Sequence, residues 1–234
     1  MTEASLDAAS IRAISFDFDD TLWPIAPVMQ RAELALRSWF SQHAPAVLDR
    51  YDEAGVHALR QRVGQANPEL LHDMTALRLK TIRVLLDSVG APVHRAEEAF
   101  SVFFKARNDI ACYDDVRLGL QRLASRFRLV GLTNGNGQPG PATGLHLLEH
   151  TVYARDVGFA KPDPRIFAHT ADHLRLEPKQ ILHVGDHPHA DVVGARTAGF
   201  QAVWLSRADA TWPTTDRQPP TVRCLLELAD RLGA

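Results

Sequence analysis

The feature that most constrains the fold is an alternation of helical and strand patterns from about residue 114 to residue 205. Helices are predicted near residues 114–125, 145–149, 165–174 and 191–198, and strands at residues 127–133, 151–154, 181–184 and 202–205. Strands that alternate with helices are typical of a parallel sheet, because each parallel crossover needs a connecting segment about as long as a helix. We therefore predict an α/β protein built on a doubly wound parallel sheet.

One more strand is predicted far from this alternation, at residues 11–18, where Ile14, Phe16 and Phe18 follow a period of two. The sequence between it and the alternation is helical in pattern, with helices expected at about residues 27–44, 46–63, 67–90 and from Pro92 onward. Asn67 and Pro68 are expected to start the third of these helices. Because the first strand must join the sheet, we interpret the helical block as an insertion. The predicted domains are an α/β core of residues 1–23 and 110–234 and a helical cap of residues 24–109.

The composition excludes several classes of function. Of the 234 residues, 45% are apolar, and 26 basic against 28 acidic residues give a net charge of −2. Charges of both signs are mixed along the chain, which offers no footprint for nucleic acid or an anionic membrane. There is no run of about 18 apolar residues and no leader pattern. Cys112 and Cys224 are too far apart to suggest a disulfide scaffold. We expect a cytoplasmic protein, either a monomer or a homodimer.

Acidic residues follow two of the predicted strands. Asp17, Asp19 and Asp20 end the first strand, and Asp186 and Asp191 follow a later one. Because parallel strands end at one edge of the sheet, Asp186 is expected to face Asp17 and Asp19, although Asp191 alone is also explained as a helix N-cap. Carboxylates about 4 Å apart repel by roughly 4 kcal/mol per pair at an effective dielectric constant of about 20, so a cation is expected among them. Oxygen ligands favour a magnesium-type ion.

Polar groups suited to an anion follow two other strands at the same edge. Thr133 and Asn134 end one strand and lead into the segment Gly135-Asn136-Gly137, whose backbone N–H groups can turn toward an anion. Lys161 lies just after another strand. The four strand ends together predict a site for a metal ion beside an anionic substrate.

These motifs resemble those of the haloacid dehalogenase-like superfamily, and they occur in that family's order over about residues 11–206. The four motifs are Asp17-Phe18-Asp19-Asp20-Thr21-Leu22, Leu132-Thr133-Asn134, Lys161-Pro162, and Gly185-Asp186 with Asp191. The resemblance implies a phosphatase in which Asp17 becomes an aspartyl-phosphate and Asp19 is the general acid and base. It further implies three phosphate-binding residues, Thr133, Asn134 and Lys161. It also implies that Mg²⁺ is held by Asp17, the backbone carbonyl of Asp19 and Asp186, with Asp191 in support.

Other patterns indicate competing functions. Gly135, Gly137 and Gly140 spell G-x-G-x-x-G after a predicted strand, with Asp156 about twenty residues later, as in a dinucleotide-binding module. However, prolines flank the last glycine and no long helix is predicted there. A cluster of histidines, His183, His187 and His189, suggests a transition-metal site. A 2-haloacid dehalogenase would use the same nucleophile without a metal and without the second acid, so Asp19 argues against that alternative.

The cap and the loops beside it indicate the substrate. Trp23-Pro24, the segment 67–75 and the segment 133–139 together resemble bacterial flavin mononucleotide (FMN) phosphatases that also act on a ribitylaminouracil phosphate of riboflavin synthesis. Trp23 stands where that pattern would have tyrosine, and His72 and Arg78 are candidate cap residues. The expected partner is thus a small phosphorylated metabolite, and the alternatives are a sugar phosphate, phosphoglycolate or a nucleotide.

Overall fold

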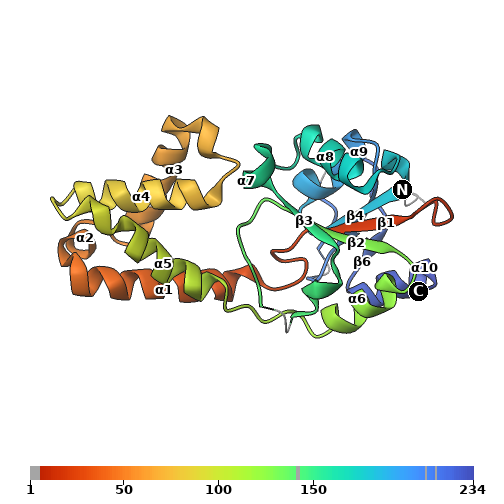
Figure 1. Cartoon of the computed structure of the whole chain (residues 1–234), viewed down its shortest axis with the longest axis horizontal. Coiled ribbons are helices and arrows are strands. Elements are labelled where there is room, and N and C mark those ends of the chain that lie inside the picture. Colours follow the sequence, from red (N-terminus) through yellow and green to blue (C-terminus); the bar gives the residue numbers. More distant parts are fainter. Residues whose placement is uncertain (1–5, 141–142, 209, 214) are drawn as a thin grey trace. The chain divides into compact units, whose positions relative to one another are not determined.

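The computed structural model describes residues 6–140, 143–208, 210–213 and 215–234, and it divides the chain into two compact units (Figure 1). The sheet unit contains the described residues up to Pro24, Ala111–Gly135 and the described residues from 143 onward. The helical unit contains Ile25–Ile110 and, separate in sequence, Asn136–Gly140. We describe each unit by itself.

Six parallel strands form one sheet in the order β3-β2-β1-β4-β5-β6 (Figure 1). They are β1 (Ala13–Phe16), β2 (Arg128–Thr133), β3 (His150–Tyr153), β4 (Ile181–Gly185), β5 (Gln201–Leu205) and β6 (Thr221–Val222). All residues of β1 and β4 are buried, as expected of parallel strands that helices cover on both faces. The predicted α/β fold is confirmed. The strand order reverses at β1 and β4, and such a switch point opens a crevice at the carboxyl ends of the strands.

Helices cover both faces of this sheet. The helices α6 (Val116–Ala124) and α10 (Leu225–Leu232) lie on one face, and α8 (Pro164–Leu174) and α9 (Gly194–Thr197) lie on the other (Figure 1). A Cβ atom on Gly119 would lie only 2.4 Å from the Cβ of Leu225, so glycine is what lets α6 approach the start of α10. The short elements are η4 (Leu145–Leu147), α7 (Ala154–Val157), η5 (Pro178–Gln180) and η6 (Pro188–Val193).

Three details of the sheet unit differ from the sequence expectations. The helix expected at 145–149 is only the single turn η4, which begins after Gly144 in a left-handed conformation. The helix expected from 191 begins three residues earlier with η6, a π-helical turn whose N-cap is His187. The side chain of Asp191 is therefore available for another role. The strand β6, only two residues long, was not expected at all.

The helical unit contains α1 (Ile25–His43), α2 (Pro45–Arg50), α3 (Glu53–Ala66), η1 (Pro68–Leu70), α4 (Met74–Asp87), η2 (Val93–Arg95) and α5 (Ala96–Arg107). The single helix expected at 46–63 is divided into α2 and α3, because Asp52 caps α3 by accepting from the Gly55 N–H at 2.7 Å. Asn67 does not start a long helix. Its amide donates to the Val63 carbonyl and closes α3, while Asp73 caps α4 instead.

Aromatic and aliphatic side chains fill the interior of the helical unit. Its largest buried members include Trp39 and Phe40 on α1 and Phe103 on α5, which pack with leucines of α4. Burial of these apolar side chains holds the helices of this unit together. In the described part of the chain, no helix combines the length and the apolar character that crossing a membrane would require.

Candidate active site

The loop after β1 carries two of the predicted site residues, Asp17 and Asp19. The Asp17 N–H donates to the Val184 carbonyl of β4 at 2.9 Å, so the strand pairing continues one residue past β1. Phe18 and Leu22 are buried, which fixes the loop against the core. Asp20 makes the turn with a φ of +60°, a left-handed conformation that aspartate tolerates better than most residues. Asp17 is consequently held at the carboxyl end of the central strand.

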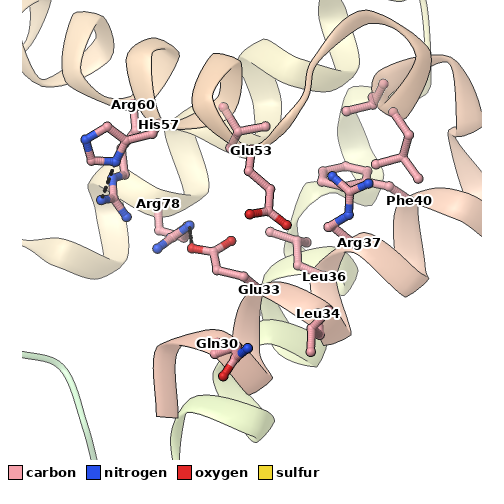
Figure 2. A pocket seen from close by; sticks show the side chains of 13 residues that line it. Gln30, Glu33, Leu34, Leu36, Arg37, Phe40, Glu53, His57, Arg60 and Arg78 are labelled. Atoms are coloured by element: carbon pink, nitrogen blue, oxygen red, sulfur yellow. Dashed lines mark hydrogen bonds and ion pairs between the residues drawn. The ribbon is translucent and has the colours of Figure 1, made fainter. Parts of the chain in front are cut away.

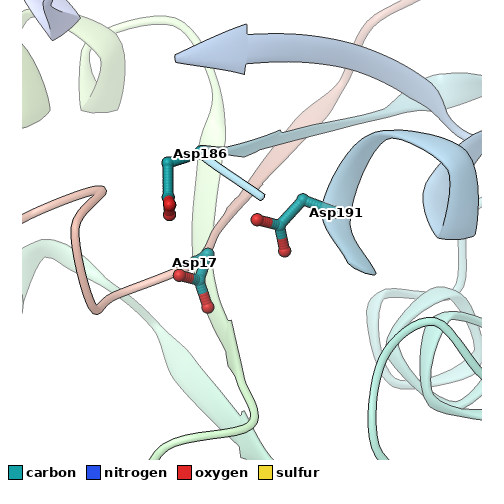
Figure 3. A group of neighbouring side chains, drawn as sticks. All are labelled: Asp17, Asp186 and Asp191. Atoms are coloured by element: carbon teal, nitrogen blue, oxygen red, sulfur yellow. The ribbon is translucent and has the colours of Figure 1, made fainter. Parts of the chain in front are cut away.

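Three carboxylates converge at this edge of the sheet. One oxygen atom each of Asp17, Asp186 and Asp191 lies within 4.8 Å of the others (Figure 3). Burial, followed by repulsion from Asp191, raises the pKa of Asp186 to about 7. Burial and the other two carboxylates also raise the pKa of Asp17, although Lys161 opposes them. A cation would relieve this excess of negative charge, and a donor set made only of oxygen atoms fits Mg²⁺.

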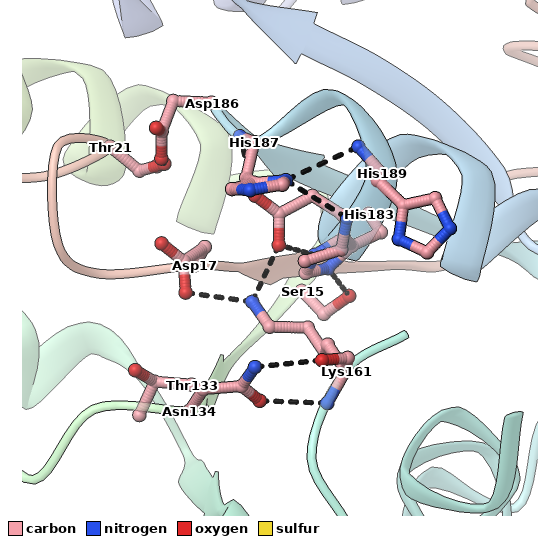
Figure 4. A network of polar contacts seen from close by, with 12 residues as sticks. Ser15, Asp17, Thr21, Thr133, Asn134, Lys161, His183, Asp186, His187 and His189 are labelled. Carbon is pink, nitrogen blue, oxygen red and sulfur yellow. Dashed lines mark hydrogen bonds and ion pairs between the residues drawn. The ribbon is translucent and has the colours of Figure 1, made fainter. Parts of the chain in front are cut away.

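Lys161 supplies the positive charge within the cluster (Figure 4). Its Nζ atom donates to Asp17 Oδ1 and to Asp191 Oδ1, each at 2.7 Å, and its side chain is 1% exposed. Burial disfavours the ammonium ion, but the two carboxylates outweigh burial and raise the pKa of Lys161. Lys161 therefore stays charged beside Asp17.

Asn134 fixes the backbone from which Lys161 projects. Its Nδ2 donates to the Lys161 carbonyl at 2.9 Å, and its Oδ1 accepts from the Lys161 N–H at 2.7 Å. Both polar ends of its side chain are thus engaged with Lys161, which connects the loop after β2 to the loop before α8. The neighbouring Thr133 is buried, and its Oγ1 accepts from the Gly135 N–H at 2.9 Å.

The carboxylate of Asp19 is not part of the three-aspartate group. Its Oδ1 accepts a hydrogen bond from Trp23 Nε1 at 2.7 Å. Its Oδ2 lies against Gly135, where a Cβ atom would be only 2.6 Å away. Trp23 and Gly135 therefore define where the Asp19 carboxylate rests. The sequence identified Trp23 only as a departure from tyrosine, and an indole N–H aimed at Asp19 was not foreseen.

Residues for which the sequence predicted no individual role support Asp186. Thr21 Oγ1 donates to Asp186 Oδ1 at 3.0 Å, and Trp204 Nε1 donates to the Asp186 carbonyl at 2.7 Å. The Thr21 carbonyl in turn accepts from Arg207, whose guanidinium also pairs with Asp115 at 2.8 Å. Thr21 belongs to the first motif, but no local pattern marks Arg207 or Asp115.

A model of haloacid dehalogenase-like hydrolases matches residues 11–199, a range that contains the three aspartates and Lys161. The chain belongs to the haloacid dehalogenase-like hydrolase family.

Similar proteins of this hydrolase family include both phosphatases and a dehalogenase. The 5-amino-6-(5-phospho-D-ribitylamino)uracil phosphatase YigB of Escherichia coli is 33% identical over 199 residues, which are 83% of each chain. A phosphoserine phosphatase of Thermus thermophilus is 32% identical over 168 residues, 69% of this chain and 63% of that protein. The crystal structure of a 2-haloacid dehalogenase from Pseudomonas syringae is 32% identical, with a TM-score of 0.87, and covers 95% of this chain and 98% of its own. The predicted enzyme class, a phosphatase of this hydrolase family, is confirmed.

The helical unit of this hydrolase contains a cavity of about 390 Å³ (Figure 2). Arg78, one of the two candidate cap residues, lies in its wall, whereas His72 is not among the lining residues. The Arg78 guanidinium is buried, pairs with Glu33 at 2.6 Å and lies over the Phe103 ring at 4.3 Å from its centre. Burial, and then the nearby Arg60, lower the pKa of Arg78 despite Glu33. Arginine and glutamate side chains thus line a recess whose other walls are largely apolar.

The structure argues against two of the competing patterns. Among the described residues, the acidic triad is the one group with the spacing of a metal site, and His187 and His189 are exposed. The His187 ring serves instead as the N-cap of η6. The glycines after β2 are not followed by the long helix that a dinucleotide fingerprint needs, since Asn136–Gly140 joins the helical unit without forming a helix of its own.

Proposed function

We propose that this hydrolase cleaves phosphomonoesters of small metabolites through an aspartyl-phosphate formed on Asp17. The observation that carries this proposal is the meeting of three carboxylates and one buried ammonium group at the switch point of the sheet. A phosphoryl group needs this combination, because its hydrolysis is very slow without covalent and electrostatic help.

The reaction divides into two steps. In the first step, an oxygen of Asp17 attacks phosphorus, the bond to the leaving oxygen breaks, and Asp19 gives that oxygen a proton. In the second step, Asp19 takes a proton from water as the water oxygen attacks phosphorus, and the bond to Asp17 breaks to release phosphate. Lys161 and the Thr133 hydroxyl bind the phosphoryl oxygens.

We propose that Asp17, Asp186 and the backbone carbonyl of Asp19 hold Mg²⁺, with Asp191 in support. Mg²⁺ held by these groups would neutralise carboxylate charge and the charge that develops on the phosphoryl oxygens. The raised pKa values of Asp17 and Asp186 support this assignment, since burial and then the neighbouring carboxylates disfavour the ionised form of each group, and a bound cation would offset both effects.

The test is hydrolysis of p-nitrophenyl phosphate by the purified full-length chain. We expect turnover that requires added Mg²⁺ and stops in EDTA. Lys161→Met, prepared in the same way, serves as the control for a contaminating phosphatase. Full turnover in EDTA, or in Lys161→Met, would contradict the proposed chemistry.

We propose that the helical unit acts as a cap that selects the leaving group, and that FMN or the ribitylaminouracil phosphate is the preferred substrate. The core motifs recognise only the phosphoryl group, so discrimination needs a second surface. The similarity to the ribitylaminouracil phosphatase of Escherichia coli supports this substrate class.

A second candidate function is 2-haloacid dehalogenation, which the similarity to the Pseudomonas syringae structure favours. Asp19, as a second acid beside the nucleophile, supports the phosphatase instead. The two functions are distinguished by measuring chloride release from 2-chloropropionate in EDTA and hydrolysis of p-nitrophenyl phosphate in Mg²⁺. Chloride release without p-nitrophenyl phosphate hydrolysis would make the dehalogenase the better assignment.

A further inference from the structure

Two polar side chains meet beneath the active site, inside the sheet. Ser15 on β1 and His183 on β4 are paired residues of adjacent strands, and both are fully buried. Ser15 Oγ lies 2.8 Å from His183 Nδ1. Their neighbours along the strands are apolar, namely Ile14, Phe16, Leu182 and Val184. Burying a hydroxyl and an imidazole at such positions costs free energy unless both are hydrogen-bonded, so their presence needs an explanation.

The other side of the imidazole ring faces the active site. His183 Nε2 lies 3.3 Å from Asp191 Oδ1, the same oxygen that accepts from Lys161 Nζ (Figure 4). A carboxylate oxygen beside an ammonium group accepts hydrogen bonds, so Nε2 is the donor. In the neutral ring Nδ1 then accepts, and the Ser15 hydroxyl donates to it. Only this arrangement of hydrogen atoms satisfies both contacts of a neutral His183.

The remaining contacts restrict the ring and the carboxylate further. The His183 ring and the Phe167 ring of α8 meet edge to face at 85°, with 5.4 Å between centroids. Asp191 Oδ2 accepts from the His187 N–H at 2.9 Å. A Cβ atom on Gly185 would lie 2.3 Å from the Asp191 carboxylate, so the strand passes directly beside it. Asp191 is therefore held by several contacts. One of them is with His183, which also contacts Ser15 on β1.

We propose that Ser15 and His183 are positioning residues, which fix the Asp191 carboxylate and through it the Lys161 ammonium group that binds the phosphoryl oxygens. This inference rests on the proposed function. Neither side chain touches the substrate. Ser15 sets which ring nitrogen of His183 donates, His183 orients Asp191, and Asp191 aims Lys161 at the position beside Asp17.

The test compares Ser15→Ala and His183→Phe with the wild-type chain in Mg²⁺-dependent hydrolysis of p-nitrophenyl phosphate. Misplacing a charged group by a fraction of an ångström lowers its effect in the transition state, so we expect kcat to fall about tenfold or more while KM changes less than about threefold. His183→Gln keeps an N–H group that can reach Asp191, and we expect it to restore kcat to within about threefold of the wild type.

The double variant separates positioning from packing. If Ser15 acts only through His183, the Ser15→Ala change has no further effect on kcat in the His183→Phe background. If the two substitutions lowered kcat by factors that multiply in the double variant, the two residues would act independently, and the proposal would be overturned. Thr170→Val is the matched control, because Thr170 is another fully buried hydroxyl of the sheet unit that bonds only within its own helix, to the Ile166 carbonyl at 2.9 Å.

Each outcome bears on one proposal. A kcat for Ser15→Ala within about twofold of the wild type would reject the positioning role and leave the phosphatase standing. A wild-type chain without phosphomonoester hydrolysis would reject the proposed function itself. Thermal unfolding of every variant identifies one that fails to fold. If His183→Phe fails in this way, Ser15→Ala and His183→Gln decide the question.

Discussion

The proposed chemistry depends most directly on Asp17. Replacement by asparagine keeps its shape but removes the nucleophilic oxygen and one negative charge. We expect Asp17→Asn to lower phosphomonoester hydrolysis by roughly a thousandfold or more, as is usual when a covalent nucleophile is removed. Steady-state hydrolysis of p-nitrophenyl phosphate in Mg²⁺ measures this, and activity within tenfold of the wild type would remove Asp17 from the nucleophile's role.

Asp19 allows a separation of proton transfer from metal binding. Its carboxylate accepts from the Trp23 indole at 2.7 Å, and an asparagine oxygen can accept the same hydrogen bond and keep the side chain in place. We expect Asp19→Asn to lower kcat by about a hundredfold or more, the usual contribution of a general acid and base. The Mg²⁺ concentration for half-maximal activity should stay unchanged, because the proposed metal contact of Asp19 is its backbone carbonyl. A weakened response to Mg²⁺ with an intact kcat would reverse the assignment.

The raised pKa of Asp186 predicts how the metal-free protein responds to pH. Its carboxyl has a pKa of about 7 when folded and about 4 when unfolded, so between these values the folded state holds a proton that the unfolded state does not. The contribution of this proton to the free energy of unfolding is complete below about pH 4 and is lost as the pH rises through about 7. Asp186→Asn cannot ionise. In EDTA, its Tm should therefore rise relative to that of the wild type between about pH 4 and pH 7, and the difference should then level off. A constant difference across this range would show that Asp186 titrates normally.

At the scale of elements, one ion pair connects three segments below the active site. Asp115, the N-cap residue of α6, accepts from Arg207, which follows β5, and from the Leu225 N–H at the start of α10. The two charged side chains are 14% and 13% exposed. Asp115→Ala leaves the largely buried Arg207 without its carboxylate, and we expect a loss of about 3 kcal/mol in the free energy of unfolding. It should also lower activity, because Arg207 holds the Thr21 carbonyl.

Urea unfolding at equilibrium measures this loss. The control is Arg83→Gln, which breaks an exposed pair with Glu97 on the helical unit and should change the free energy of unfolding far less than Asp115→Ala does. Equal effects of Asp115→Ala and Arg83→Gln would mean that Asp115 is no more than a surface charge.

Strand ends were the most predictable part of the site. Asp17, Asp186 and Asp191 follow strands with strong apolar patterns, so the rule that parallel strands end at one edge was enough to bring them together with Lys161. Contacts between side chains of different strands were not predictable. Ser15 and His183 are 168 residues apart, and nothing in the sequence around either one indicates the other.

The elements that the sequence missed are those that depend on tertiary contacts. β6 has two residues, too few for any periodicity, and it forms because the edge of β5 offers hydrogen-bonding groups, as in the bond from the Trp204 N–H to the Pro220 carbonyl. The break between α2 and α3 depends on which of several polar residues becomes a cap. Asp52 is the N-cap residue of α3, and Asp73, not Asn67, is the N-cap residue of α4.

At the scale of the whole molecule, substrate choice is the property that the core motifs leave open. We expect kcat/KM to be highest for FMN or the ribitylaminouracil phosphate, above a hexose phosphate and phosphoglycolate. The physical reason is that, in the cap role proposed for the helical unit, only a large leaving group gains transition-state binding from that unit. A preference of tenfold or more for a small substrate, about 1.4 kcal/mol in transition-state binding, would overturn the flavin-related assignment and leave the phosphatase chemistry intact.

Because Asn136–Gly140 belongs to the helical unit, an exchange of this unit between related proteins needs more than one segment. The chain crosses between the units four times, after Pro24, Ile110, Gly135 and Gly140. Hydrogen bonds from the Asn136 amide to Thr75 and from the Gln138 N–H to Asn108 connect the short segment to the rest of the helical unit. The helical unit is thus not a single cassette. A chimera that exchanges the helical unit with that of a relative has to include both pieces, since 25–110 alone would separate Thr75 and Asn108 from their hydrogen-bond partners Asn136 and Gln138.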